Sequence, residues 1–226
     1  MKKKPLSKYD IEYENAVSCI FFFLIDYKKA LKLIPKPFLP KHFFKNKALA
    51  VLSFYDYPKS SIGPYKEAAL AIKSRHTLEE ESGFFVVNLP VTSKEAFIKG
   101  KKYWGFNKTL ENIEVYQSKK NYHARIFNLR NKNTLEVKSV LRFGFNLRYR
   151  DTLLFSLKNK RPVKSRLQTN GMGKLFLFSR FRLILTDKTN SISKTIQSLE
   201  LDKKQPFLSF ISNKYNAQLL EAERIS

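Results

Sequence analysis

One lysine in this chain stands in a setting that could make it a nucleophile instead of a surface cation. Lys108 ends the stretch GKKYWGFNK, in which Tyr103, Trp104 and Phe106 come just before it. Only a neutral amine attacks a carbonyl, and a lysine with the usual pKa of about 10.4 is almost wholly charged at neutral pH. Burial among aromatic rings disfavours the ammonium form and activates the amine. The pattern therefore indicates a lysine that could act as a nucleophile, and a solvated loop lysine is the alternative.

A carboxylate that could serve this lysine lies in a second segment, SIGPYKE, at residues 61–67. The segment is a turn that feeds a strand, and side chains two residues apart in a strand point to the same face, so Tyr65 and Glu67 share one. A carboxylate beside a nucleophilic amine could move protons to and from it, and Glu67 is a candidate for this. The alternatives are a surface Glu67 paired with Lys66 or Lys73, and a Tyr65 that is core with its hydroxyl satisfied.

Short strands and a few helices must position these residues. Apolar and alternating segments predict strands, which we place at residues 16–25, 48–57, 65–72 and 84–91. Asp26 and Ser93 are expected to cap helices that follow the first and the last of these strands.

The rest of the chain is also rich in predicted strands. Residues 111–150 alternate apolar and polar side chains between polar turns, which is typical of an antiparallel meander, and residues 174–187 add a strand or a pair. Residues 192–202 and 206–225 could each contain a helix or a strand. The pattern predicts a mainly β (α+β) chain whose antiparallel sheet closes into a barrel or cone.

The composition fits one folded domain with a basic surface. The chain has 226 residues, of which 43% are hydrophobic and 14% aromatic, enough apolar mass for a core. We expect a single domain over residues 11–226, after a basic tail at residues 1–10. The net charge of +24 attracts polyanions, but Lys and Arg are spread along the whole chain, which favours a solvated surface. Because of this charge, a protein that binds nucleic acid or an acidic surface is kept as one alternative for function, after the two that are described below.

The sequence gives little support for a metal site, a disulfide or a membrane-spanning helix. Cys19 is the single cysteine, so no internal disulfide can form, and we expect a reducing, cytoplasmic location. His42, His76 and His123 are scattered, and no two have the spacing of a metal site. The apolar run at residues 19–25 is much shorter than the roughly twenty residues of a membrane helix.

Two segments together resemble the acetoacetate decarboxylase family. GPYKE at residues 63–67 is similar to the family's Gly-Pro/Ala-Tyr-x-Glu strand. The run from a strand through a short helix, with GK at 100–101 and GFNK at 105–108, is similar to the family's Gly-Arg/Lys and Gly/Ala-Phe/Tyr-Pro-Lys ending. DYKKALKLIPKPF at 26–38 resembles the family's helix that leads into a Pro-rich segment. The resemblance covers residues 16–110, and beyond them the chain shares only a strand-rich character with the family.

This resemblance implies a cone or barrel around an apolar cavity, in which Lys108 forms an imine and Glu67 acts as acid/base. Acetoacetate decarboxylase is itself the standard example of a lysine activated in this way. The implied substrate is a keto acid or related carbonyl compound, and the implied reaction is decarboxylation or aldol and dehydration chemistry. The resemblance implies no metal or organic cofactor, and it implies a homo-oligomer.

Aromatic residues of the two segments could form the wall of this cavity, and a place in the ordinary core is the alternative for each of them. Tyr65, Trp104 and Phe106 are expected to line it. A second cavity carboxylate is expected from residues 79–81, and we take Glu81 for this role.

Three residues depart from the family pattern. Asn107 stands where the family has proline, Thr109 where the decarboxylases have a second lysine, and Leu24 where they carry an arginine. A carboxylate substrate would then need another cation, such as Lys73 or Arg75. These departures motivate the second alternative for function, a non-catalytic barrel that binds an apolar or anionic ligand.

Overall fold

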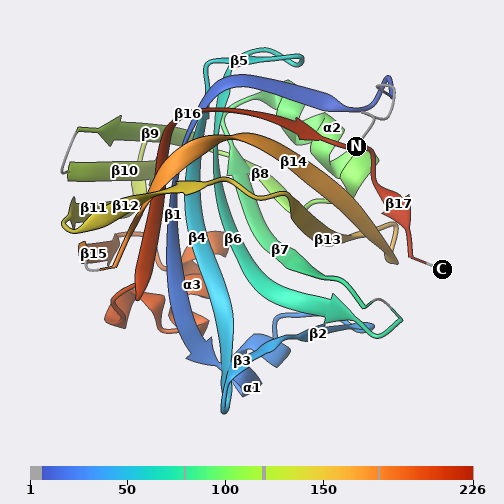
Figure 1. Ribbon diagram of the computed structural model, residues 1–226, viewed down its shortest axis with the longest axis horizontal. Helices are drawn as coiled ribbons and strands as arrows, with labels where there is room; N and C mark the ends of the chain where they lie inside the picture. The colour runs from blue at the N-terminus through green and yellow to red at the C-terminus, as the bar shows by residue number, and fades with distance from the viewer. Residues whose placement is uncertain (1–6, 79, 119–120, 178, 226) are drawn as a thin grey trace.

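The chain folds into a large mixed β-sheet that curls into a cone, with a smaller sheet and short helices packed around it (Figure 1). The computed structural model describes residues 7–78, 80–118, 121–177 and 179–225. Seven strands of the large sheet form the ring of the cone: β6 (Tyr65–His76), β4 (Lys47–Tyr57), β1 (Ile11–Asp26), β16 (Leu208–Leu219), β14 (Arg161–Phe176), β13 (Thr152–Lys158) and β7 (Ser82–Val91). Pairing between β6 and β7 closes this ring.

The remaining elements extend or cover the ring. Six further strands belong to the large sheet: β2 (Phe38–Pro40), β3 (His42–Phe44), β5 (Lys59–Ser60), β8 (Lys108–Leu110), β12 (Gly144–Arg148) and β17 (Glu223–Arg224). The smaller sheet contains β9 (Asn112–Gln117), β10 (Asn121–Phe127), β11 (Asn133–Leu141) and β15 (Ser179–Leu185). The helices are α1 (Tyr27–Leu31), α2 (Lys94–Trp104), α3 (Ser191–Ser198) and the 3-10 helix η1 (Leu201–Lys203).

The predicted fold class, a mainly β chain closed into a cone with a few short helices, is confirmed. The sheet is mixed, because β7 pairs in parallel with both β13 and β8. Both predicted helix caps are present: the side chain of Asp26 accepts from the Lys29 amide and that of Ser93 from the Ala96 amide. Of the two undecided segments, the first forms α3 and the second forms β16.

Strand β1 explains why the sequence contains an unbroken apolar run. Its odd-numbered residues, Cys19, Phe21 and Phe23, are fully buried on the outer face of the cone. Its even-numbered residues, Ile20 and Phe22, line the inner cavity. Since successive side chains of a strand point to opposite faces, a strand covered on both sides reads as continuous hydrophobicity.

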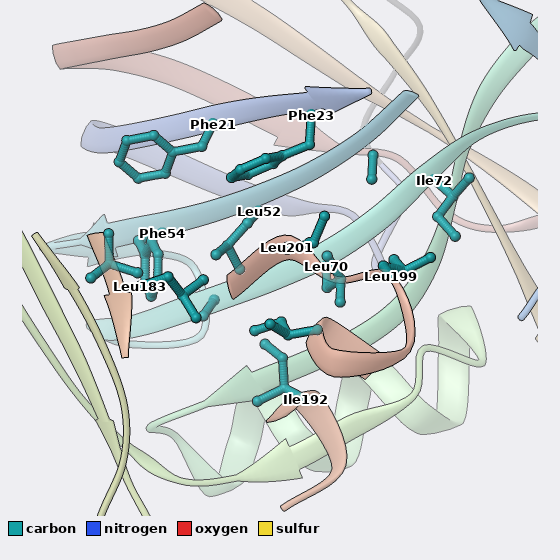
Figure 2. Packing of buried hydrophobic residues seen from close by; sticks show 14 of the residues in the cluster. Phe21, Phe23, Leu52, Phe54, Leu70, Ile72, Leu183, Ile192, Leu199 and Leu201 are labelled. Atoms are coloured by element: carbon teal, nitrogen blue, oxygen red, sulfur yellow. The ribbon is translucent and has the colours of Figure 1, made fainter. Parts of the chain in front are cut away.

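The main core lies on the outer face of the ring, between the ring strands, the smaller sheet and α3. Figure 2 shows Phe21, Phe54 and Leu70 of the ring facing Leu183 of β15 and Ile192 of α3. Each fully buried side chain of this size contributes about 1.5–3 kcal/mol. Because the outer face carries this packing, the inner face of the cone is left to form a cavity.

The predicted basic tail lies partly outside the described residues, which begin at Ser7. The described part of it is anchored to the C-terminal end of the chain. Asp10 accepts a hydrogen bond from the Glu221 amide at 2.8 Å, and the Ser7 hydroxyl donates to the Glu221 carboxylate at 2.8 Å. The two ends of the described chain therefore lie side by side.

Candidate active site

A cavity of about 290 Å³ occupies the inner face of the cone. Its wall is mainly apolar and aromatic and is built from the ring strands, α2 and the segment that contains β12. The five predicted site residues that line it are Tyr65, Glu67, Trp104, Phe106 and Lys108. The structure thus brings together residues that are up to 43 positions apart in the sequence.

Lys108 and Glu67 form a buried ion pair in this cavity. Lys108 Nζ lies 2.6 Å from Glu67 Oε2, and the two side chains are 5% and 11% exposed. The amine also lies 5.8 Å from the centroid of the Tyr65 ring. The contact distance is that of a strong charge-assisted hydrogen bond, across which a proton can move directly between amine and carboxylate.

A tight turn between α2 and β8 delivers Lys108 to the cavity. Gly105 ends the helix in the left-handed conformation with φ of 66°, and its amide donates to the Lys101 carbonyl. This bond is that of an αL C-cap motif, and the Phe106 amide donates in addition to the Gly100 carbonyl. Asn107 then fixes the chain to β7, since its side-chain amide donates to the Val87 carbonyl at 2.8 Å.

Gly100 makes room for the lysine side chain. A Cβ atom at this position would lie 2.2 Å from Lys108 Cε and 2.5 Å from Lys108 Cδ. The aliphatic part of the lysine therefore runs directly over the backbone of α2. Gly100 and Gly105 have separate roles, one in contact with the lysine and one in the turn that reverses the chain.

Six tyrosines line the cavity: Tyr13, Tyr55, Tyr57, Tyr65, Tyr149 and Tyr215. The Tyr13 and Tyr65 hydroxyls are 3.1 Å apart. Burial raises the pKa of both phenols well above the usual value, and the nearby Glu67 carboxylate adds a smaller contribution in the same direction. Burial likewise raises the pKa of Tyr55 to about 12. These hydroxyls are therefore protonated at neutral pH and can donate hydrogen bonds into the cavity.

Trp104 and Phe106 form part of the wall. Both are buried, and the Trp104 indole Nε1 donates to the Leu220 carbonyl at 2.8 Å. The satisfied indole holds the ring in one orientation beside the lysine.

The prediction that Glu81 lines the cavity is wrong. Glu81 is exposed and forms an ion pair with Arg166 at 2.7 Å. Glu80 is also exposed, and Glu79 lies outside the described residues. Arg75, which pairs in register with Ser82, lies at the same end of β6 as this turn, far along the strand from Glu67.

The cations considered as replacements are not in the cavity either. Lys73 donates to the Ser82 carbonyl at 3.0 Å and lies over the Phe84 ring, and Arg75 is exposed. Instead Arg148 and Arg150 line the cavity at its exposed rim. Within the described ranges neither of these arginines has an ion-pair partner.

Sequence reasoning missed the contribution of the second half of the chain. Arg148, Tyr149, Arg150, Phe210 and Tyr215 all line the cavity. The ladder from β1 through β16 to β14 and β12 brings them there. The repeated aromatic and basic residues of RYR at 148–150 were a signal, but an alternating strand explains the same pattern without a site.

Other kinds of site are not found in the described part of the chain. No group of three or more His, Cys, Asp or Glu residues there could hold a metal ion. The helices in the same ranges are all too short or too polar to cross a bilayer.

A β-cone with a buried lysine–carboxylate pair in an apolar cavity is the arrangement that the family resemblance implied. The sequence profile described as Acetoacetate decarboxylase (ADC) matches residues 2–191, which is most of the chain. The chain therefore belongs to the acetoacetate decarboxylase family. Among curated proteins no sequence matches it.

Solved structures of this family share the fold at low sequence identity. The acetoacetate decarboxylase of Legionella pneumophila subsp. pneumophila str. Philadelphia 1 matches with a TM-score of 0.72 and 14% identity, over 100% of this chain and 92% of that one. An acetoacetate decarboxylase-like enzyme from Sphingomonas wittichii RW1 gives 0.71 and 12%, over 100% and 96%. The enduracididine biosynthesis enzyme MppR, complexed with pyruvate, gives 0.70 and 10%, over 100% and 93%.

Proposed function

We propose that this protein is a Schiff-base-forming carbon–carbon lyase that acts on a keto acid or related carbonyl compound. The observation that carries the proposal is the buried contact of 2.6 Å between Lys108 Nζ and Glu67 in an apolar cavity. At this distance a proton can pass directly from the amine to the carboxylate, which leaves the amine free to attack a carbonyl. Lys108 is the nucleophile and Glu67 is the acid/base.

The steps of a decarboxylation follow from these two groups. Glu67 accepts a proton from Lys108, and the neutral amine adds to the substrate carbonyl carbon. The carbonyl oxygen is protonated and leaves as water, which gives a protonated imine. When the substrate is a β-keto acid, loss of CO2 from the carbon next to the imine places the electron pair of the broken C–C bond in the imine, and the resulting enamine is protonated at carbon. One water then hydrolyses the imine and releases the ketone and Lys108.

Two further observations support a keto-acid substrate. The related MppR has been solved with pyruvate, a keto acid. In this chain the Arg148 and Arg150 side chains lie at the rim of the cavity and offer charge to a carboxylate. They would supply the cation that the family pattern lacks at Leu24 and Thr109.

Borohydride trapping tests the proposal. The protein is incubated with a panel of keto acids and aldehydes, reduced with borohydride, and examined by intact mass and peptide mapping. We expect a covalent adduct on Lys108 with at least one compound. A folded protein that gives no Lys108 adduct across the panel would contradict the proposal.

A non-catalytic member of the family is the second candidate. Thr109 stands where the decarboxylases carry a second lysine next to the nucleophile, so that cation is missing from this chain. If the cavity only binds its ligand, trapping gives no adduct, and Lys108→Met leaves the ligand affinity nearly unchanged.

Removal of the two rim arginines is expected to weaken the binding of keto-acid substrates more than that of neutral ones. The double change Arg148→Ala with Arg150→Ala should raise KM for a trapped keto acid by about tenfold or more, as expected for losing a hydrogen bond to a charged group. A neutral aldehyde should be affected less than about twofold, because it has no carboxylate. The measurement is KM for both substrates, with Arg130→Ala in the β10–β11 turn as control. Equal effects on both substrates would show that the arginines do not bind a carboxylate.

A further inference from the structure

The apolar wall of the cavity continues onto an exposed strand. Ser53, Ile20, Phe210, Leu175 and Phe145 are successive cross-strand partners on β4, β1, β16, β14 and β12. Directly opposed residues share one face of a sheet, so these five form a row along the inner face of the cone. The first four line the cavity, and Phe145 is 50% exposed.

Three apolar residues form an exposed lip where this row leaves the cavity. Phe143, Phe145 and Leu147 alternate along the chain at β12, so they lie on the same face. They are 75%, 50% and 39% exposed, and Leu147 also lines the cavity. Exposed apolar surface that continues a cavity wall is typical of a ligand-binding groove.

The polar end of the cavity lies near one end of this row. Ala69, the β6 partner of Ser53, is two positions from Glu67, the ion-pair partner of Lys108. A carbonyl group at Lys108 therefore places the rest of its molecule against the apolar row. The cavity volume of 290 Å³ is close to the roughly 300–1,000 Å³ of sites for drug-sized ligands, so a small keto acid would leave most of it empty.

We propose that the site takes carbonyl compounds with a long apolar chain. The reactive end lies at Lys108, and the chain runs along the row to the lip of Phe143, Phe145 and Leu147. This inference rests on the proposed function for the position of the carbonyl. The apolar tail of such a substrate lies against residues that take no part in imine formation.

Binding of straight-chain saturated carboxylic acids tests the tail site without imine formation. The probes run from hexanoate to dodecanoate, below their micellar concentrations, and none of them can react with a lysine. Trp104 is the single tryptophan and lines the cavity, so its fluorescence reports binding, with calorimetry as a second measurement. We expect Kd to fall about fourfold for each added methylene, which corresponds to about 0.8 kcal/mol.

A single substitution on the lip distinguishes binding at this site from nonspecific hydrophobic binding. Phe145→Ser should weaken the binding of dodecanoate about fivefold or more and leave the affinity for hexanoate unchanged, because only the longer chain reaches the lip. Hexanoate binding also shows that the variant is folded. Leu129→Ser is the matched control: Leu129 is 63% exposed in the β10–β11 turn, at the opposite end of β11 from the lip, and does not line the cavity.

Three outcomes would overturn the inference. The first is an affinity that does not rise with the chain length of the acid. The second is a Phe145→Ser variant that binds acids of all chain lengths more weakly by the same factor. The third is a Phe145→Ser variant whose molecular mass in solution differs from that of the unchanged protein while its chain-length dependence stays the same. The last would show that the lip is an interface between copies of the chain. Failure of the proposed function would appear differently, as absence of a Lys108 adduct while the chain-length dependence is kept.

Discussion

Lys108→Met is expected to abolish the trapped adduct and to lower the free energy of unfolding by about 3–5 kcal/mol. The first effect follows because methionine has no amine to form an imine. The second follows because the change leaves the Glu67 carboxylate buried without its cation at 2.6 Å. Adduct formation is read by intact mass after reduction, and stability by urea denaturation.

A second substitution separates the loss of the amine from the loss of the pair. Lys108→Met combined with Glu67→Leu removes both charges, and the stability is expected to recover largely, because an apolar pair of similar volume replaces the ion pair. The double variant still forms no adduct. Glu67→Gln alone keeps the amine and is expected to slow turnover by about 10²–10⁴, the usual loss when a general acid/base is removed.

Lys66→Met is the matched control for these variants. Lys66 is the neighbour of Glu67 on β6, and its side chain is 34% exposed with an ion-pair distance of 3.9 Å to Asp56. We expect its stability to change by less than about 0.5 kcal/mol and its adduct to form normally. If Lys108→Met were as stable as Lys66→Met, Lys108 and Glu67 would not form a buried pair in solution.

Local chemistry and the family resemblance made part of this site predictable from the sequence. The caps at Asp26 and Ser93 depend only on side chains that bond to the next few amides. The alternation of Tyr65 and Glu67 depends only on the period of a strand. The segment that ends at Lys108 is recognisable because its helix, two glycines and aromatic residues are contiguous in the sequence.

The position of Glu81 could not be predicted because distance along a strand is not visible in a loose alignment. Glu81 precedes Ser82, which pairs with Arg75, and Arg75 is eight residues beyond Glu67 on β6. At about 3.3 Å per residue, this separation is about 26 Å. An acidic turn at one end of a strand therefore cannot reach a lysine at the other end.

The rim arginines and the lip depend on long-range pairing that the sequence does not specify. Residues 143–150 reach the cavity only because β12 pairs with β14, which pairs with β16 and then β1. The exposed apolar residues of β12 read as an ordinary meander strand in the sequence. Only the register of four neighbouring strands shows that Phe145 continues the row of Ile20 and Phe210.

Gly100→Ala is expected to reduce imine formation on Lys108 by about 10²-fold, the scale of loss for a displacement of about 1 Å in an active site. The added Cβ would lie 2.2 Å from Lys108 Cε, so the lysine side chain must shift away from α2 and from Glu67. This clash is expected to lower the free energy of unfolding. Helix propensity alone predicts an increase instead, since Ala in place of Gly stabilises a helix by about 1 kcal/mol. The sign of the measured change therefore reports whether the lysine lies against the helix.

Lys101→Ala supplies the control on the same helix, because Lys101 is exposed in its last turn. We expect Lys101→Ala to keep the rate of adduct formation, measured by a time course of borohydride trapping, while Gly100→Ala loses it. Because the Gly100 carbonyl still accepts from the Phe106 amide, the turn itself is retained in both variants. A Gly100→Ala protein that is more stable and forms the adduct at the normal rate would show that Lys108 does not cross α2 at this glycine.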